Sequence, residues 1–331
     1  MNRTDRPQGI TRRDALRLLG AASLSPAAMA ADPPYPSRPL RIIVPFAAGA
    51  STDFLSRVLA DRLATQLNQA VTIDNKPGAG GILGTQQLAR AAADGYTLGI
   101  TSLATLAMVP ATLKDPPYDA VRDFAPLSVL VSNDMVLATG MGVPARTLSE
   151  YVAWAKRQQA PLFLGTQGPG TSGHFAGFMF GNAAKIKFEP IHYKSLGDLV
   201  TGAIAGDVQA YFGAPSTVVS HVQAGKLRLL ATNGATRLPG FQDVPTFGEA
   251  GYPDMQYLNW VGMAVPANVP SEIQAMLSNE LIRAATVPSV RKKLEDGGFR
   301  VIASKPEEMA ALVSKDVGFW RDMVKTTGFK V

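Results

Sequence analysis

The segment LRIIVPFAAGASTDFLSRVLADRL, from Leu40 to Leu63, contains a strand, a loop and a helix in succession. Leu40–Phe46 is an apolar run of strand length, and the apolar residues of Asp53–Leu67 recur at the spacing of an amphipathic helix. The loop between them, Ala47–Thr52, has no large side chain and no charge. This succession is typical of α/β proteins, which bind ligands where a strand gives way to a helix.

The same alternation of apolar runs and amphipathic helices continues along the chain and predicts mostly parallel sheets covered by helices. Further predicted strands are Ala70–Asp74, Tyr96–Ser102, Pro161–Thr166, Phe188–Tyr193, Val208–Gly213, Leu227–Asn233, Tyr257–Pro266 and Phe299–Ala303. Further predicted helices are Ile82–Ala92, Ser172–Ala184, Leu196–Ala205, Ser216–Ala224, Ser271–Ala285, Ser289–Asp296 and Pro306–Thr327.

The order of these elements predicts two α/β lobes, because the chain can leave the first lobe, build the second and return. The two crossings are expected near Val129–Met135 and Tyr257–Val261. Lobe 1 then comprises residues 31–133 and 259–331, and lobe 2 comprises residues 134–258. A chain of 331 residues that is 46% hydrophobic is large enough for two such units.

Composition excludes several classes of function. Five arginines and two aspartates in residues 1–30 account for +3 of the formal net charge of +6, and no basic cluster follows Arg17, so nucleic acid is not an expected partner. The chain has no cysteine, which excludes disulfides and thiol catalysis, and only three histidines, which argues against a histidine-rich metal site. We therefore expect no metal and no cofactor.

The N-terminal stretch ITRRDALRLLGAASLSPAAMAAD predicts an export signal over residues 1–30. Arg12 and Arg13 form a twin-arginine pair, an apolar run follows, and Ala28–Ala30 is a small-x-small cleavage site. Ala15 departs from the twin-arginine motif, so ordinary Sec export is the alternative. The apolar run is shorter than the roughly 20 residues of a spanning helix. We expect cleavage after about Ala30 and a periplasmic protein that is not embedded in the membrane.

Three loops of small residues each join a predicted strand to a predicted helix: PFAAGAST, KPGAGGILGT and GTQGPGTSGH. Helix starts present free N–H groups and a positive dipole end, and small residues let a ligand approach the backbone. Together the loops predict a site for a carboxylate or phosphate that needs no arginine. The alternative is that each loop is only a turn. Ser51 or Thr52 is predicted to cap the first helix.

Two enzyme interpretations compete with a binding site. Gly168–Gly173 matches G-x-G-x-x-G, and Glu189 follows, as in a dinucleotide site. Gly170–His174 resembles a nucleophile elbow, but Ser172 and His174 are two residues apart at a helix start and do not face each other. We assign no catalytic residue, and an exported dinucleotide-dependent enzyme remains the alternative.

The loops lie in a longer series of motifs, including YPSRPLRIIVPFAAGASTD, IDNKPGAGGILGTQQLARAAADGYTL, PPYDAVRDFAPLSVLV, GTSGHFAGFMF, IHYKSLGDLVTGAIAGDVQAYF and LPGFQDVPTFGEAG. In their order and spacing these resemble the Bug-type extracytoplasmic solute receptors, the substrate-binding proteins of tripartite tricarboxylate transporters. The resemblance implies a two-lobed Venus-flytrap fold, with a small carboxylate bound in the cleft between the lobes. It also implies membrane transporter subunits as partners, or a sensor protein in an orphan receptor.

The resemblance further implies the ligand-binding residues. In lobe 1 they are Phe46, Ala47, Gly49, Ala50, Ser51, Thr52, Gly78, Ala79, Gly80, Gly81, Thr101 and Ser102. In lobe 2 they are Gly168, Thr171, Ser172, His174, Tyr193, Gly213 and Ala214. Two positions depart from the family pattern: Ala50 replaces a common second glycine, and Gly213 stands where many members carry an aspartate. The missing aspartate favours a ligand whose distal end is neutral, apolar or acidic over an amino acid.

Overall fold

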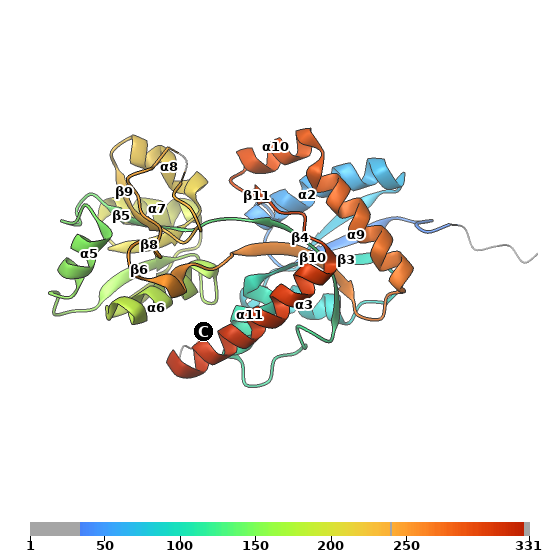
Figure 1. Ribbon diagram of the computed structural model, residues 1–331, viewed down its shortest axis with the longest axis horizontal. Helices are drawn as coiled ribbons and strands as arrows, with labels where there is room; N and C mark the ends of the chain where they lie inside the picture. Colours follow the sequence, from blue (N-terminus) through green and yellow to red (C-terminus); the bar gives the residue numbers. More distant parts are fainter. Residues whose placement is uncertain (1–33, 239, 328–331) are drawn as a thin grey trace, which may run out of the picture. The chain divides into compact units, whose positions relative to one another are not determined.

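Two β-sheets form the framework of the chain in the computed structural model, which describes residues 34–238 and 240–327 (Figure 1). Every element described below lies in the unit that begins at Arg38. The export signal predicted for residues 1–30 lies outside the described residues.

The first sheet has six strands in the order β11-β4-β10-β3-β1-β2. Its strands are β1 (Leu40–Val44), β2 (Val71–Asn75), β3 (Thr97–Ser102), β4 (Phe124–Ser132), β10 (Trp260–Pro266) and β11 (Arg300–Val301). β1 pairs in parallel with β2 and β3, so that Ile42 lies opposite both Ile73 and Leu98. β10 runs antiparallel to β3 and β4, and β11 runs antiparallel to β4. The carboxyl ends of β1, β2 and β3 therefore share one edge of the sheet.

The second sheet has five strands in the order β7-β6-β8-β5-β9. Its strands are β5 (Val136–Gly140), β6 (Leu162–Thr166), β7 (Phe188–His192), β8 (Ala210–Gly213) and β9 (Leu227–Thr232). β6 pairs in parallel with β7 and β8, while β5 is antiparallel to β8 and β9. The α/β prediction is confirmed. Both sheets are mixed around a parallel core, because β5 and β10 enter from the opposite sheet and run against both of their neighbours.

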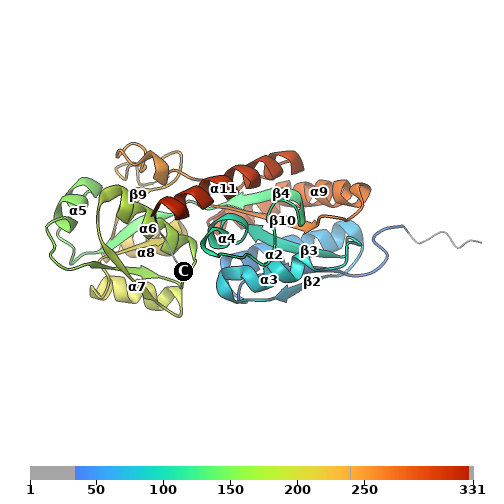
Figure 2. The same cartoon turned by 90° about the horizontal axis from the view of Figure 1, so that it is seen from below.

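Helices flank both sheets. Those beside the first sheet are α2 (Ser51–Leu67), α3 (Ile82–Ala89), α4 (Val109–Thr112), α9 (Ser271–Thr286), α10 (Pro288–Asp296) and α11 (Pro306–Thr327). Those beside the second are α5 (Leu148–Ala155), α6 (Ser172–Ala184), α7 (Leu196–Ala205) and α8 (Pro215–Gln223). Short turns are 3-10 helical at Ala79–Gly81 and Pro253–Met255 and π-helical at Ala104–Met108. α11 packs against β4 and the π-helical turn, and Figure 2 shows it lying along the first sheet.

Several elements were absent from the sequence prediction. β4 and β5 lie in the run DFAPLSVLVSNDMVLATG, in which the sequence predicted only a crossing near Val129–Met135. β4 and β5 are buried along nearly their whole length, so neither shows the alternation that marks a strand with one solvent face. α4 and α5 were also missed, and β10 begins at Trp260 rather than Tyr257.

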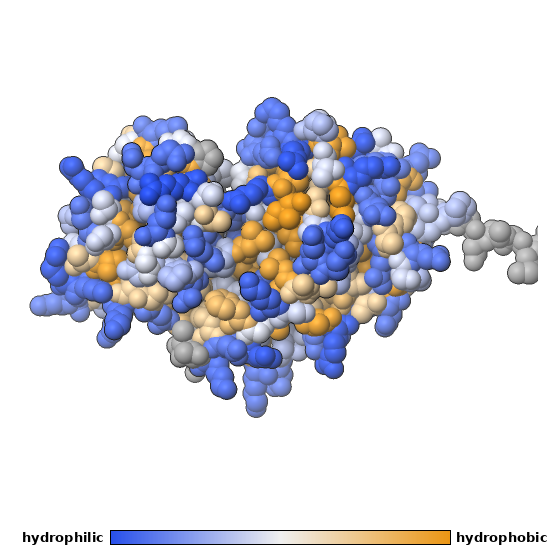
Figure 3. Space-filling view, viewed as in Figure 1, coloured by the Kyte–Doolittle hydropathy of each residue, from blue (hydrophilic) through white to orange (hydrophobic). Residues whose placement is uncertain are grey.

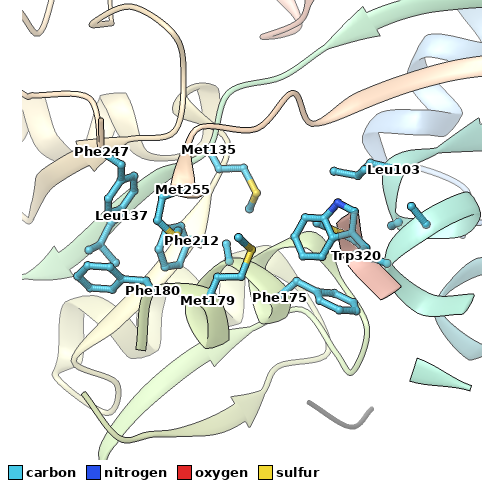
Figure 4. Close-up of a cluster of buried hydrophobic side chains, with 14 of the residues drawn as sticks. Leu103, Met135, Leu137, Phe175, Met179, Phe180, Phe212, Phe247, Met255 and Trp320 are labelled. Atoms are coloured by element: carbon cyan, nitrogen blue, oxygen red, sulfur yellow. The ribbon is translucent and has the colours of Figure 1, made fainter. Parts of the chain in front are cut away.

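A buried apolar cluster joins the two sheets at α11 (Figure 4). Leu103 follows β3 of the first sheet, whereas Phe212 belongs to β8 of the second. Trp320 on α11 is 1% exposed, and its ring centroid lies 5.5 Å from that of Phe175 and 5.4 Å from that of Tyr257, both edge to face. Large buried aromatic rings dominate core energetics, so this contact ties α11 to the start of α6.

The surface is mixed in character. On the face seen in Figure 3, apolar residues show between α9 and α10 and are surrounded by hydrophilic ones. Across the described ranges, no helix is long and apolar enough to cross a membrane. The same ranges contain no group of three or more histidines, aspartates or glutamates placed to hold a metal ion.

The cluster at α11 predicts that two adjacent aromatic residues contribute very differently to the stability of the fold. Trp320→Ala should lower the free energy of unfolding by about 3–5 kcal/mol, because it empties a buried site. Phe319→Ala, on the same helix but at a position that is 41% exposed, should cost at most about 1 kcal/mol. Urea denaturation followed by circular dichroism measures both. Equal losses would show that Trp320 does not anchor the two sheets.

Candidate functional site

The loops that follow β1, β2 and β6 come together although they belong to two sheets. A Cβ atom built on Gly81, in the second loop, would lie 3.3 Å from Cζ of Phe46 in the first loop. A Cβ atom built on Gly80 would lie 3.9 Å from the carbonyl oxygen of Gly170 in the third loop. The three segments of small residues therefore face one another, and a bound group between them could touch backbone from both sheets.

The first loop is held in place by the carboxylate of Asp53. Its Oδ2 accepts hydrogen bonds from Gly49 N and Arg57 Nε, each at 2.9 Å, and its Oδ1 accepts one from Asn75 Nδ2 at 3.0 Å. Asn75 Nδ2 also donates to the carbonyl oxygen of Phe46 at 3.1 Å. The Arg57 hydrogen bond is the main reason that the pKa of Asp53 falls from its ordinary 3.8 to about 2. The carboxylate thus ties together the loop, the start of α2 and the end of β2.

The predicted capping of α2 by Ser51 or Thr52 is wrong. Both residues lie inside the helix, and the N-cap is Ala50, whose side chain can accept no hydrogen bond. Asp53, in the first turn, accepts a hydrogen bond from the N–H of Gly49, one residue before the N-cap, and so holds the loop without capping the helix. The N–H groups of Ser51 and Thr52 remain without an intrahelical acceptor, because they belong to the first turn. The loop keeps these donors for another partner.

Thr52 and Thr101 each bury a hydroxyl that finds no partner in the described part of the chain. Thr52 is 7% exposed and Thr101 is fully buried at the end of β3. Buried hydroxyls in proteins are almost always hydrogen-bonded, and these two are the members of the predicted site among six described residues whose buried hydroxyl has no partner. Ser102 differs, because its Oγ accepts from the N–H of Thr105 at 3.2 Å and so serves the local turn.

The third loop is organised by His174, which is 7% exposed. Its Nδ1 accepts a hydrogen bond from the N–H of Gly170 at 3.2 Å, which requires that nitrogen to be unprotonated. Burial, with a smaller contribution from nearby His192, lowers the pKa of His174 to about 4, so the ring is neutral at neutral pH. The ring's proton therefore lies on Nε2. Thr171 completes the turn, as its Oγ1 donates to the carbonyl oxygen of Gly168 at 2.9 Å.

Ser172, the first residue of α6, reaches across to the returning strand. Its Oγ donates to Oδ1 of Asn259 at 3.2 Å, and Nδ2 of Asn259 donates to Oδ1 of Asn133 at 3.1 Å. Asn133 and Asn259 lie on the two segments that connect the sheets. The start of α6 is therefore linked by hydrogen bonds to both connections.

The three remaining predicted residues end or follow β7 and β8, whose carboxyl ends lie at the same edge of the second sheet as the third loop. The Tyr193 hydroxyl packs against Gly202 of α7, and partial burial raises the pKa of Tyr193. A Cβ atom on Gly213 would lie 3.0 Å from the ring of Tyr211, so that ring already fills the space beside Gly213. Ala214 is the N-cap of α8.

Neither enzyme interpretation gains support from the geometry. The G-x-G-x-x-G segment does join β6 to α6, but Glu189 lies opposite Phe163, near the start of β7 and away from the loop. A dinucleotide site needs its acidic residue at the carboxyl end of the next strand, beside the ribose. Ser172 bonds to Asn259 and His174 to Gly170, so they form no nucleophile–base pair.

In the part of the chain that the structure describes, the helices that follow the converging loops have no side-chain cap, a feature that they share with α8, α9 and α10. Thr147 caps α5 and Ser195 caps α7, each by accepting from a first-turn N–H. Within the described residues, no side chain caps α2, α6 or α8. These helix starts present N–H groups and positive dipole ends, a combination that binds anions.

Comparison with known proteins gives a consistent result. The family model described as "Tripartite tricarboxylate transporter family receptor" matches residues 55–329. Protein BugT of Bordetella pertussis is 30% identical over 298 residues, which cover 90% of this chain and 91% of BugT. MatC (Rpa3494) from Rhodopseudomonas palustris with bound malate is 28% identical, with a TM-score of 0.78 and coverage of 88% and 100% of the two chains. R. palustris Rpa4515 with adipate is 26% identical, with a TM-score of 0.79 and coverage of 89% and 98%.

The Asp53 network predicts a pH-dependent contribution to stability. A carboxyl whose pKa falls on folding stabilises the fold above its unfolded pKa, near 3.8, and loses that contribution as the pH falls through about 2. Asp53→Asn should therefore cost about 2 kcal/mol at pH 7, with the difference from wild type shrinking between pH 4 and pH 2. Denaturant titrations over this pH range provide the measurement.

Asp61→Asn is the matched control, because Asp61 is exposed on the same helix. It should change stability by less than about 0.5 kcal/mol at every pH. A cost for Asp53→Asn that stays constant from pH 7 to pH 2 would contradict the assigned role of the carboxylate.

Proposed function

The chain belongs to the tripartite tricarboxylate transporter receptor family, and we propose that it captures a small organic carboxylate at its three converging loops. This membership confirms the resemblance found in the sequence. The chain is a periplasmic solute-binding protein of a transporter family, and not an enzyme. What we propose beyond this is the class of ligand and the residues that bind it.

The observation that carries the proposal is the convergence of uncapped helix starts from both sheets. α2 begins beside the first loop and α6 beside the third, and the nearest approach of the loops is at Gly80 and Gly170. Arg57, four residues into the helix from Asp53, is already paired with that carboxylate. An anion at the loops would therefore be bound by backbone N–H groups and hydroxyls, which suit a carboxylate.

Dicarboxylates are the ligand class that fits best. The related structures MatC and Rpa4515 contain malate and adipate, which both carry two carboxylates. We place one carboxylate at the N–H groups of Ser51 and Thr52 and the other near Ser172 and the neutral ring of His174. Gly213 offers no negative side chain for an ammonium group, in keeping with a ligand whose distal end is acidic or apolar.

The two sheets correspond to two proposed lobes, residues 31–133 with 259–331 and residues 134–258. A ligand that touches loops from both would favour the closed arrangement, because only that arrangement offers all of its contacts. The proposed partners are the membrane subunits of the transporter, with a sensor protein as the alternative. Export through the signal at residues 1–30, with cleavage after about Ala30, would deliver the receptor to the periplasm.

The proposal predicts that Thr52→Val weakens ligand binding without destabilising the fold. If the buried Thr52 hydroxyl bonds to the ligand carboxylate, its loss should cost about 1.5–3 kcal/mol, or roughly tenfold to a hundredfold in Kd. Because the hydroxyl has no partner in the described chain, its removal should leave the melting temperature of the unliganded protein unchanged or higher. Isothermal titration calorimetry with malate and with adipate measures the affinity.

Thr139→Val is the control, because Thr139 buries an equally unpartnered hydroxyl in β5, away from the loops. It should bind as wild type does. Wild-type affinity in Thr52→Val would remove Thr52 from the site. The absence of binding to any organic acid by the wild type would overturn the ligand class.

A further inference from the structure

The turn Gly297–Gly298 separates the first turns of two helices that belong to different sheets. A Cβ atom on Gly297 would lie 2.6 Å from Cε1 of Phe54, in the first turn of α2. A Cβ atom on Gly298 would lie 2.6 Å from Oγ and 2.8 Å from Cβ of Ser216, in the first turn of α8. The turn therefore packs directly between the ring of Phe54 and the first turn of α8.

The end of α10 explains why Gly298 has a positive φ. It does not explain why Ser216 of α8 lies so close to Gly298. Its φ is +86°, its N–H donates to Glu295 O at 2.9 Å, and the N–H of Phe299 donates to Leu294 O at 3.1 Å, as in a Schellman motif. This motif favours glycine wherever it occurs. It does not require a second helix to approach the glycine within van der Waals distance.

Gly251 shows the same motif without the neighbour. Its φ is also +86°, its N–H donates to Gly248 O at 3.1 Å, and the N–H of Tyr252 donates to Phe247 O at 2.8 Å. No described heavy atom outside the adjoining residues lies within 4 Å of a Cβ built there. The contact with Ser216 is therefore a property of Gly298 and not of the turn type.

We propose that Gly298 is a positioning residue of the ligand site, whose missing side chain lets the start of α8 close onto the start of α2. This rests on the proposed function, because Phe54 lies two residues after Thr52, a proposed donor of the first loop, and Ser216 lies two residues after the N-cap of α8. The contact at Gly298 and that between Gly80 and Gly170 are two points where the sheets approach each other. Together they set the separation of the groups that hold the two ends of a ligand.

A methyl group at Gly298 would clash with Ser216 and push the start of α8 away from the turn. Ordinary carbon–carbon contacts are about 3.5–4.0 Å, so a Cβ atom 2.8 Å from Cβ of Ser216 forces the two helix starts apart by about 1 Å. Ser216 cannot relieve this by changing rotamer, because its Cβ is fixed by the helix backbone. Hydrogen bonds weaken steeply beyond about 3.2 Å, so a shift of this size uncouples one end of a bound ligand.

The test compares Gly298→Ala with Gly251→Ala in calorimetric titrations with malate and adipate. Both variants carry the same penalty for a positive φ, and Gly298→Ala adds the clash with Ser216, so its melting temperature should fall further. Gly298→Ala should weaken binding about tenfold or more, whereas Gly251→Ala should stay within about twofold of wild type. Ser216→Gly removes the Cβ and Oγ atoms with which the new methyl group clashes. The double variant Gly298→Ala with Ser216→Gly should therefore recover most of the affinity. Equal affinities for the two alanine variants, or no recovery, would overturn the proposal.

A second measurement does not depend on a ligand. The chain has no cysteine, so the variant combining Gly298→Cys and Ser216→Cys carries the only two thiols. It should form a disulfide under mild oxidation, whereas Gly251→Cys with Ser216→Cys should not. Failure of the first pair to cross-link would refute the contact. Cross-linking of the first pair, together with no binding of malate or adipate by the wild-type protein, would refute the ligand class while supporting the contact.

Discussion

The carboxylate of Asp53 is the interaction on which the site depends. It accepts hydrogen bonds from the first loop, from α2 and from the end of β2, and so fixes the entry to the helix. Because Asp53 holds the loop through Gly49 and Asn75, the residues before it can be small and free of charge. Without these hydrogen bonds, a loop of small residues would have no side-chain contacts to fix its backbone conformation. These bonds hold the loop at Gly49 and Phe46, and in our proposal its first-turn N–H groups bind the ligand.

The second requirement is that loops from two sheets stay in reach of each other. Trp320 packs against Phe175, one residue beyond His174, and so connects α11 to the loop that closes the site from the second sheet. Asn259 adds a polar link from the returning strand to Ser172. Binding through the backbone tolerates little displacement, since hydrogen bonds are short-ranged. The buried aromatic cluster around Trp320 and the closely packed turn at Gly298 both keep the loops of the two sheets within reach of each other.

Local patterns in the sequence predicted α6, α7 and α11 to the residue, and the three loops at the ends of β1, β2 and β6. Features that depend on distant residues were not predictable. Asn75 reaches Asp53 only because β1 and β2 are adjacent, so the bonds that hold Asp53 could not be read from the residues around it. β4 and β5 lack alternation because both of their faces are buried. The closeness of Gly298 to Ser216 has no local signal at all, since any Schellman turn would supply the glycine.

The most direct test of the central claim, that backbone N–H groups at the loops hold a carboxylate, is an amide NMR titration of the ¹⁵N-labelled protein with adipate. We expect the largest amide shifts at Ser51, Thr52, Gly80 and Ser172, all moving at the same ligand concentration. The contrary result is a set of unchanged helix starts with the largest shifts elsewhere, for example around the surface hollow lined by Arg237, Thr246 and Glu249. Such a result would place the ligand outside the converging loops and contradict the account.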